Sequence, residues 1–199
     1  MRRYVPPSVT GTIETLVTRL EMRTPPATPL ALPRRAGIQV VEARRITAAF
    51  YRFLYDAVGE PWCWTGRRLI DDVELLRRVR GFGVEIDVLW ADGVPAGYVE
   101  LERETDADEV FIAYFGLMPP FIGAGLGRWF LDWSVRRAWQ FDPRRILVQT
   151  CDLDHPAALP NYQRAGFVCC GEFVEVVSLI AGMEPVRARP FRRPLQPAR

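Results

Sequence analysis

The stretch "FGLMPPFIGAGLGR" (residues 115–128) is the most informative part of this chain. Two prolines are followed by glycines at three alternating positions, Gly123, Gly125 and Gly127, and then by the helical pattern "RWFLDWSVRRAWQF". A helix start leaves about four backbone N–H groups without partners at the positive end of the helix dipole. Bare backbone there lets a phosphate approach closely. The alternative is a tight turn that packs against a neighbouring helix.

The glycine spacing excludes two familiar phosphate-binding loops. A dinucleotide-binding loop has the pattern G-x-G-x-x-G, and counting from Gly123 its third glycine falls on Arg128. The Walker loop needs a lysine, and all 26 basic residues of this chain are arginine. The absence of lysine also excludes a Schiff base and a lysine general base.

The segments around this stretch predict a mixed α/β layer fold. Apolar positions at helical spacing follow a strand at 37–43, and an aspartate pair opens a short helix at 71–80. A hairpin over 84–104 turns at Asp92-Gly93, and a third strand covers 109–118. The remaining elements are a helix after the glycines, a buried strand at 144–151, a helix at 156–167 and closing strands over 167–180.

The two ends differ from the middle in composition. Residues 23–35 and 184–199 are rich in proline and arginine, which predicts extended or disordered segments. Between them, the alternating segment 11–22 is expected to be a strand or an arm laid on the core. We therefore predict an N-terminal arm over 1–36, one domain over 37–181 and a C-terminal tail over 182–199.

Composition narrows the functional classes. A net charge of +2 gives no reason to expect nucleic-acid binding. No run of 18 apolar residues predicts a membrane span, and one histidine with four cysteines gives no zinc-type spacing. A cytoplasmic enzyme with reduced thiols and no metal is expected.

Two linked motifs resemble the GNAT (GCN5-related N-acetyltransferase) superfamily. The first is "LMPPFIGAGLGRWFL" (117–131) and the second, about 28 residues on, is "HPAALPNYQRAGF" (155–167). Gly125 and Gly127 match the paired glycines of the family, and Tyr162 and Gly166-Phe167 match its second motif. The chain departs from the pattern at Ile122, where the family has glutamine or arginine, and at His155, where it usually has asparagine. The resemblance covers about three-quarters of the chain.

The resemblance implies a mostly antiparallel central sheet with helices on both faces, splayed between the strands 109–118 and 144–151. It implies acetyl-CoA or another acyl-CoA as co-substrate, with its pyrophosphate on the backbone of 122–128 and its pantetheine arm between the splayed strands. The cofactor-binding residues expected from the motifs are Leu117, Met118, Ile122, Gly123, Ala124, Gly125, Leu126, Gly127, Arg128, His155, Ala158 and Tyr162.

The chemistry implied is direct attack of an amine on the thioester, giving an N-acyltransferase and in particular an N-acetyltransferase. Tyr162 is the expected general acid for the departing thiolate, because ordinary pKa values of ~10 and ~8.5 make that transfer uphill by only about 2 kcal/mol. Candidates for the general base are Glu109, Glu100 and His155, with Asp154 beside it. The family's glutamate position falls on Phe111, so no single residue is favoured.

The acceptor site is expected around the first two helices and the loop "GEPWCWTG" (59–66). Glu60, Trp62 and Trp64 are its candidate residues, since paired tryptophans can wall an apolar acceptor or clamp a cation. They are equally compatible with core packing under the loop. The acceptor is expected to be a small-molecule or peptide amine, and a homodimer is left open.

Three alternatives are weighed against this interpretation. The departures at Ile122 and Phe111 suit a catalytically degenerate acyl-CoA-binding regulatory protein. Cys151 and His155 could form a cysteine-nucleophile enzyme, although no further partner with a known signature is visible. The arginine- and proline-rich ends could serve a scaffold or interaction protein.

Overall fold

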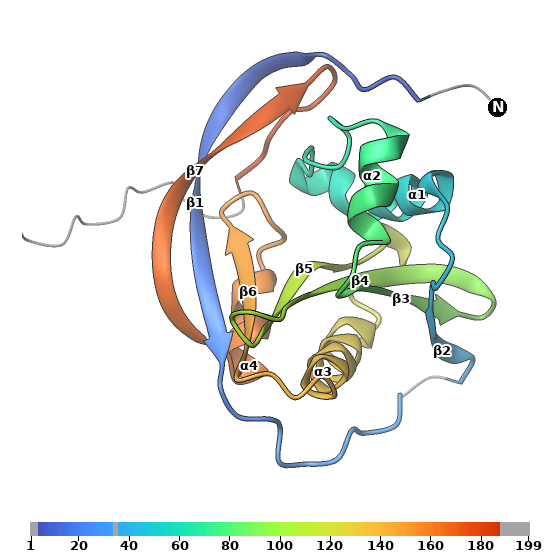
Figure 1. The fold of residues 1–199 in the computed structure, drawn as a ribbon, viewed down its shortest axis with the longest axis vertical. Helices are drawn as coiled ribbons and strands as arrows, with labels where there is room; N and C mark the ends of the chain where they lie inside the picture. The colour runs from blue at the N-terminus through green and yellow to red at the C-terminus, as the bar shows by residue number, and fades with distance from the viewer. Residues whose placement is uncertain (1–3, 34–35, 188–199) are drawn as a thin grey trace, which may run out of the picture.

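The computed structural model describes residues 4–33 and 36–187 (Figure 1). The expected tail 182–199 is thus described only as far as 187, and residues 1–3 and 34–35 of the expected arm also lie outside the described residues. The elements in chain order are β1 (Val9–Met22), β2 (Ile38–Glu42), α1 (Ala48–Gly59), η1 (Glu60–Trp62), α2 (Asp72–Val79), β3 (Val84–Ala91), β4 (Val94–Glu104), β5 (Glu109–Leu117), η2 (Pro119–Phe121), α3 (Leu126–Trp139), β6 (Arg145–Cys151), α4 (Ala158–Arg164) and β7 (Val168–Ile180).

The seven strands form one sheet in the order β2-β3-β4-β5-β6-β1-β7. Every neighbouring pair is antiparallel except β5 and β6, which run parallel. The connection between these two strands carries α3, as a parallel crossover requires. The predicted mixed α/β fold with a mostly antiparallel sheet is confirmed.

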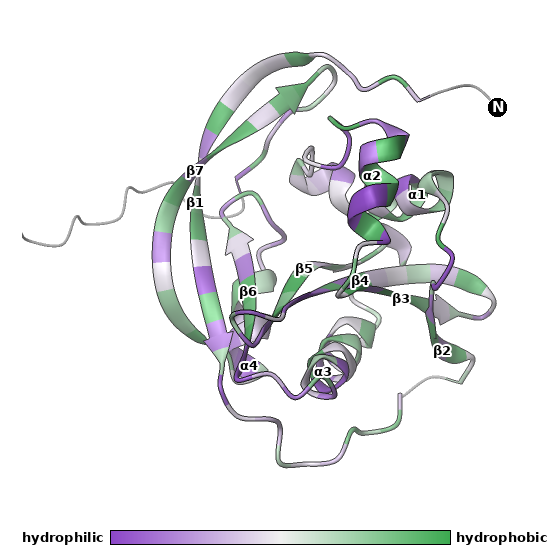
Figure 2. Cartoon of the chain, viewed as in Figure 1, coloured by the Kyte–Doolittle hydropathy of each residue, from purple (hydrophilic) through white to green (hydrophobic). Residues whose placement is uncertain are grey.

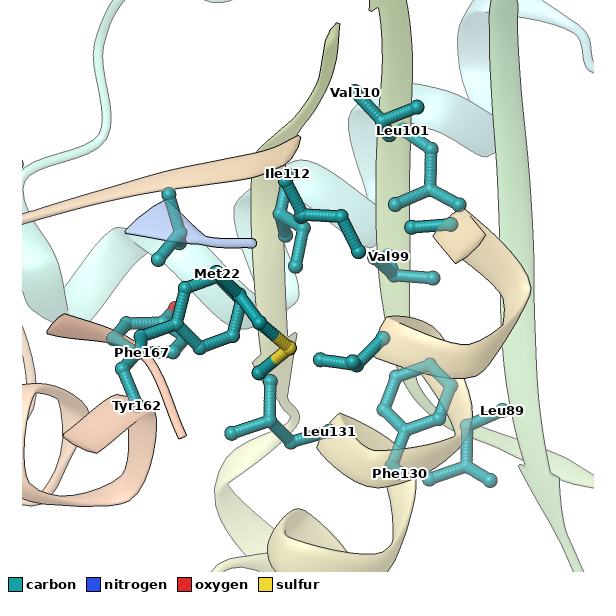
Figure 3. Packing of buried hydrophobic residues seen from close by; sticks show 14 of the residues in the cluster. Met22, Leu89, Val99, Leu101, Val110, Ile112, Phe130, Leu131, Tyr162 and Phe167 are labelled. Atoms are coloured by element: carbon teal, nitrogen blue, oxygen red, sulfur yellow. The ribbon is translucent and has the colours of Figure 1, made fainter. Parts of the chain in front are cut away.

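Helices cover both faces of the sheet and bury two separate apolar clusters. On one face, α1 and α2 pack Tyr51, Leu54 and Leu75 against β3 and β4. On the other, α3 and α4 pack against β4, β5 and β6, with Phe130 and Tyr162 in the cluster (Figures 1 and 3). Alternate residues of β4 serve the two faces, because successive side chains of a strand point to opposite sides.

The short helices begin where the sequence supplies caps. Thr47 accepts a hydrogen bond from the Phe50 N–H at the start of α1, and Asp71 accepts one from the Glu74 N–H at the start of α2. Such caps satisfy one of the free N–H groups of a helix start. Among the described residues, no helix is long and apolar enough to cross a bilayer.

The segment 11–22 is not an arm laid on the core. It belongs to β1, which lies within the sheet between β6 and β7 and pairs with β7 from Val9↔Ile180 to Glu21↔Val168. β1 and β7 form a long curved pair at one side of the molecule, with polar and apolar residues interspersed along both strands (Figure 2). Of the two expected possibilities the structure has the strand, which alternation identifies without naming its partners.

Candidate active site

Strands β5 and β6 separate partway along their length. Their pairing runs from Glu109↔Arg145 to Ile112↔Val148 and then stops, although β5 continues to Leu117 and β6 to Cys151. At the same point β5 carries one extra residue against β4, because Glu100 pairs with Tyr114 while Leu101 pairs with Ile112. A bulge of this kind bends its strand. The bulge accounts for the splay between 109–118 and 144–151, and backbone groups that would have formed ladder bonds face the gap.

The glycine segment turns into α3 through left-handed backbone. Gly123 has φ +84° and Gly125 has φ +79°, and a Cβ built on either would meet no atom within 4 Å. These glycines therefore do not serve close packing against a neighbouring helix, which was the alternative explanation. Among the described residues, the N–H groups of Gly123, Ala124 and Gly125 make no backbone hydrogen bond. The turn presents bare N–H groups to open space at the start of a 14-residue helix.

The first cavity, of about 490 Å³, joins the gap to this turn. Its walls come from β5, the glycine turn, the start of α4 and the loop after α1. Nine of the expected cofactor-binding residues line it: Leu117, Ile122, Gly123, Gly125, Gly127, Arg128, His155, Ala158 and Tyr162. Within the described part of the chain, the Arg128 guanidinium forms no ion pair and remains exposed at the cavity.

Three expected cofactor-binding residues do not line this cavity. Met118 is buried in the cluster under α1 and α2, and Leu126 is buried in the cluster under α3. Ala124 is exposed on the turn. The side chains of Met118 and Leu126 anchor the two ends of the turn, so only their backbone atoms can contact a ligand.

Tyr162 lies in the first cavity with its side chain almost wholly buried beside Phe115 and Phe167 (Figure 3). Burial, and then the negative charge of Asp154, raise the pKa of its hydroxyl above the ordinary 10. The hydroxyl therefore stays protonated across neutral pH and is available as a donor. Full transfer of this proton to a thiolate would also be more uphill than the ordinary value implies, so the hydroxyl is better suited to donate a hydrogen bond than to give up its proton.

His155 lines the first cavity with its ring edge-on to Trp62, at 5.1 Å between centroids. Its Nδ1 accepts a hydrogen bond from the Ala157 N–H at 3.0 Å. A neutral imidazole that accepts at one nitrogen carries its proton on the other. The neutral ring can thus donate from Nε2 but has no free lone pair to act as a base.

The two candidate glutamates lie elsewhere. Glu109 begins β5, at the end where β5 and β6 are paired, and its carboxylate forms ion pairs with Arg144 and Arg145. It does not line the first cavity, so the geometry gives no support for Glu109 as a base.

Glu100 is completely buried behind the cavity walls. It accepts hydrogen bonds from the Tyr51 hydroxyl at 2.5 Å and from Arg67 at 2.6 Å. Burial raises the pKa of Glu100 to about 7, against the opposing effect of the Arg67 charge. Its strand partner is Tyr114, which does line the first cavity. Glu100 thus has a suitable pKa for a base but no exposed surface for contact with an acceptor.

A second cavity, of about 360 Å³, lies next to the first. Loop residues 62–66 form one side, and strands β1, β6 and β7 form the other. Five residues line both cavities, and we call them the shared wall: Trp62, Trp64, Tyr114, Gln149 and Asp154. Both tryptophans therefore line the two cavities, and Trp64 also packs against the apolar cluster under α1 and α2. Glu60 is exposed and lines neither cavity.

Several site residues escaped the sequence analysis. Gln149 was visible as a polar side chain directly after "ILV" in a strand expected to be buried, and that was a usable signal. Tyr114 looked like an ordinary strand residue. Glu175 reaches the second cavity only because β1 pairs with both β6 and β7, a placement that the local pattern does not encode.

Within the described residues, no group of three or more His, Cys, Asp or Glu side chains is placed to hold a metal ion. Cys151 lines the second cavity, and burial raises its pKa to about 11. A thiol with that pKa is almost wholly protonated at neutral pH, which argues against the cysteine-nucleophile alternative.

The fold has solved counterparts at low sequence identity. A GCN5-related N-acetyltransferase from Sphaerobacter thermophilus matches with a TM-score of 0.59 at 17% identity over 91% of this chain and 55% of that one. A conserved protein of unknown function from Staphylococcus epidermidis matches with a TM-score of 0.59 at 17% identity over 85% of this chain and 64% of that one. This chain thus spans well under two thirds of the Sphaerobacter protein and slightly under two thirds of the Staphylococcus protein.

A shorter counterpart is covered almost completely. The ribosomal-protein-S18-alanine N-acetyltransferase from Escherichia coli matches with a TM-score of 0.55 at 11% identity over 75% of this chain and 98% of that one. Among curated proteins the sequence has no match. The family model for the acetyltransferase (GNAT) family matches residues 44–167, which is more than half of the chain and includes the gap, the glycine turn and Tyr162. The chain therefore belongs to the GNAT acetyltransferase family.

Proposed function

We propose that this protein is an N-acetyltransferase that moves an acetyl group from acetyl-CoA to an amine in a ternary complex. The observation that carries the proposal is the continuity of three features: the gap beyond Ile112 and Val148, the bare turn at Gly123–Gly127, and Tyr162 in the same cavity. Bound acetyl-CoA would supply the activated acyl group as a thioester. The binding contacts and the proton-transfer roles are assigned to side chains and backbone of this chain.

The first cavity fits the parts of acetyl-CoA. The free N–H groups of the turn and the unpaired guanidinium of Arg128 would hold the pyrophosphate, and charge-assisted bonds in parallel make such a site strong. Apolar Ile122 replaces the family's polar side chain, so backbone supplies most of that contact. Along 113–117, the backbone groups on the edge of β5 that faces β6 would pair with the pantetheine amides in the manner of an added strand.

The second cavity fits the acceptor, because it meets the first at the shared wall. We assign Asp154 to orient the attacking amine, since it lines both cavities. The nitrogen forms a C–N bond as the C–S bond breaks. Of the two protons that the ammonium loses, one leaves to solvent and one ends on the thiol sulfur. Tyr162 donates a hydrogen bond to that sulfur as charge develops on it.

Calorimetry with acetyl-CoA and a thiol-release assay against a panel of amines test the proposal together. We expect binding without added metal, and thiol release that depends on both the amine and the enzyme. Absence of any affinity for acetyl-CoA or CoA would contradict it. Tight binding with no thiol release across polyamines, amino acids, aminoglycosides, aryl amines and peptide N-termini would favour an acyl-CoA-binding regulatory protein instead.

A further inference from the structure

The second cavity carries negative charge and no positive charge. Its described lining includes the carboxylates of Asp154 and Glu175 but no arginine or histidine, in a chain where arginine is the commonest charged residue. The first cavity, in contrast, has Arg128 and His155 in its lining. Like charges gathered in a cleft with low-dielectric walls raise the local concentration of the opposite ion. The lining of the second cavity therefore attracts cations and repels carboxylates.

Asp154 is held in place but retains capacity for one more partner. One carboxylate oxygen accepts a hydrogen bond from Trp64 Nε1 at 3.3 Å. The other accepts from the Thr150 hydroxyl at 2.8 Å and from the Cys151 N–H at 2.9 Å. A carboxylate has about four acceptor sites, so roughly one stays available. Asp154 lines both cavities, so a ligand in either one can approach it.

Glu175 lies on β7, at a different part of the second cavity. It pairs with Thr15 of β1 across the ladder and is exposed. Within the described part of the chain it forms no hydrogen bond or ion pair. β7 contributes to the second cavity and not to the first, so Glu175 is remote from the thioester side. It is a free anion available for a group of the acceptor that does not react.

Aromatic rings line the space that both carboxylates face. Trp62, Trp64 and Tyr114 belong to the shared wall, and Tyr55 lies beside them, 5.1 Å from Tyr114 between centroids. Such rings pack well against methylene or aryl groups and attract cations to their faces. They suit an apolar spacer between two charged ends.

We propose that the acceptor is a dicationic amine: a primary amine joined through an aliphatic or aromatic spacer to a second cationic group, and without a carboxylate. Asp154 engages the reacting amine, the rings contact the spacer, and Glu175 engages the distal cation. This inference rests on the proposed acetyltransferase function and specifies its substrate class.

Three matched acceptors test the inference: 1,5-diaminopentane, pentylamine and lysine. The second lacks the distal cation, and the third adds a carboxylate to the first. In the thiol-release assay we expect kcat/KM for the diamine to exceed that for pentylamine by about fivefold, the upper end of the range for an exposed ion pair. Lysine should be poorer than the diamine by a larger factor, because its carboxylate meets two like charges. A series from 1,3-diaminopropane to 1,8-diaminooctane should show one preferred length.

Glu175→Gln, which keeps the size of the side chain, should bring the ratio of kcat/KM for diamine over pentylamine to within about twofold and flatten the length series. Glu104→Gln removes an exposed carboxylate that lines neither cavity, and should leave the wild-type ratio. Equal kcat/KM for the diamine and pentylamine in the wild type, or a best acceptor that carries a carboxylate, would overturn the inference alone. A complete lack of thiol release with every amine would overturn the acetyltransferase proposal, and the inference with it.

Discussion

The two cavities share a wall yet are built in different ways. The first is shaped by backbone: a strand gap that begins at Ile112 and a turn through Gly123 and Gly125 that offers N–H groups. The second is lined by residues from six separated parts of the chain, with carboxylates among aromatic rings. A backbone site binds what all members of a family share, whereas a side-chain site can change with each substitution. The difference explains why the co-substrate can be inferred from the sequence and the acceptor cannot.

The largest effect should come from filling the backbone site. Gly125→Val places a β-branched residue at φ +79°, a conformation that costs about 1–3 kcal/mol for non-glycine residues, and covers the N–H groups. We expect the affinity for acetyl-CoA, measured by calorimetry, to fall about 100-fold or more. Gly11→Val is the matched control, because Gly11 also has open space around it but no positive φ. Affinity within threefold of wild type in the folded Gly125 variant would refute the backbone assignment.

Removing one hydroxyl from the first cavity should affect turnover and spare binding. Tyr162→Phe keeps the packing against Phe115 and Phe167 but removes the proposed donor to the leaving sulfur. We expect kcat to fall tenfold or more, with acetyl-CoA affinity within about threefold of wild type. Tyr4→Phe controls for loss of a tyrosine hydroxyl, since that hydroxyl bonds to the Arg68 carbonyl away from both cavities. Unchanged kcat in Tyr162→Phe would remove the acid role.

The buried carboxyl behind the shared wall should make stability depend on pH. Burial raises the pKa of Glu100 to about 7 from the ordinary 4.5, so its ionisation in the folded state is penalised. That penalty is absent below about pH 4.5, grows between about pH 4.5 and 7, and stays constant above 7, where both states are ionised. We expect the unfolding free energy of the wild type to fall by up to about 3 kcal/mol between pH 5 and 8 from this group.

Urea titrations across that pH range would measure the effect. Glu100→Gln should flatten the pH dependence, even though loss of the carboxylate leaves Arg67 without its buried partner and lowers stability overall. Glu102→Gln, at a half-exposed partner of the same arginine, should keep the wild-type slope. An equal slope in wild type and Glu100→Gln would show that Glu100 is ionised throughout.

The smallest effects should come from Glu109 and His155, two candidate bases whose contacts in the structure do not suit that role. Glu109→Gln changes a carboxylate bound to two arginines at the paired end of β5, so kcat/KM should change less than twofold. His155→Gln should keep the shape of the pH–rate profile, because Nδ1 is already occupied by the Ala157 N–H. A lost limb of that profile in either variant would restore the residue as a base.

Sequence alone predicted the features that local chemistry dictates. The glycine turn, the strand before it and the position of Tyr162 follow from motifs in which each residue has a physical task. Gly123 and Gly125 adopt positive φ, which favours glycine. Closely spaced glycines before a helix can be recognised from the sequence alone. The helices were found because apolar periodicity and caps are local signals.

Features that depend on long-range pairing were not predictable. Nothing in "GTIETLVTRLEM" says that this strand separates β6 from β7, so the contribution of Glu175 to the acceptor side stayed hidden. Glu109 was a candidate because it lies two residues before Phe111, the family's glutamate position, but the bulge opposite Glu100 sets where the gap begins. Side-chain partners such as Arg145 are likewise invisible until the strands are in register.

The ladder between β1 and β7 constrains how the molecule can be assembled during synthesis. β1 precedes every other strand in the chain, yet its neighbours, β6 and β7, are the last two to leave the ribosome. Such high contact order slows folding and leaves a 14-residue strand with both edges bare in the meantime. Glu14, Arg19 and Glu21 interrupt its apolar residues with charge, as gatekeepers against aggregation do. The charges that look misplaced in an interior strand are therefore suited to limit aggregation of the nascent chain until its partners arrive.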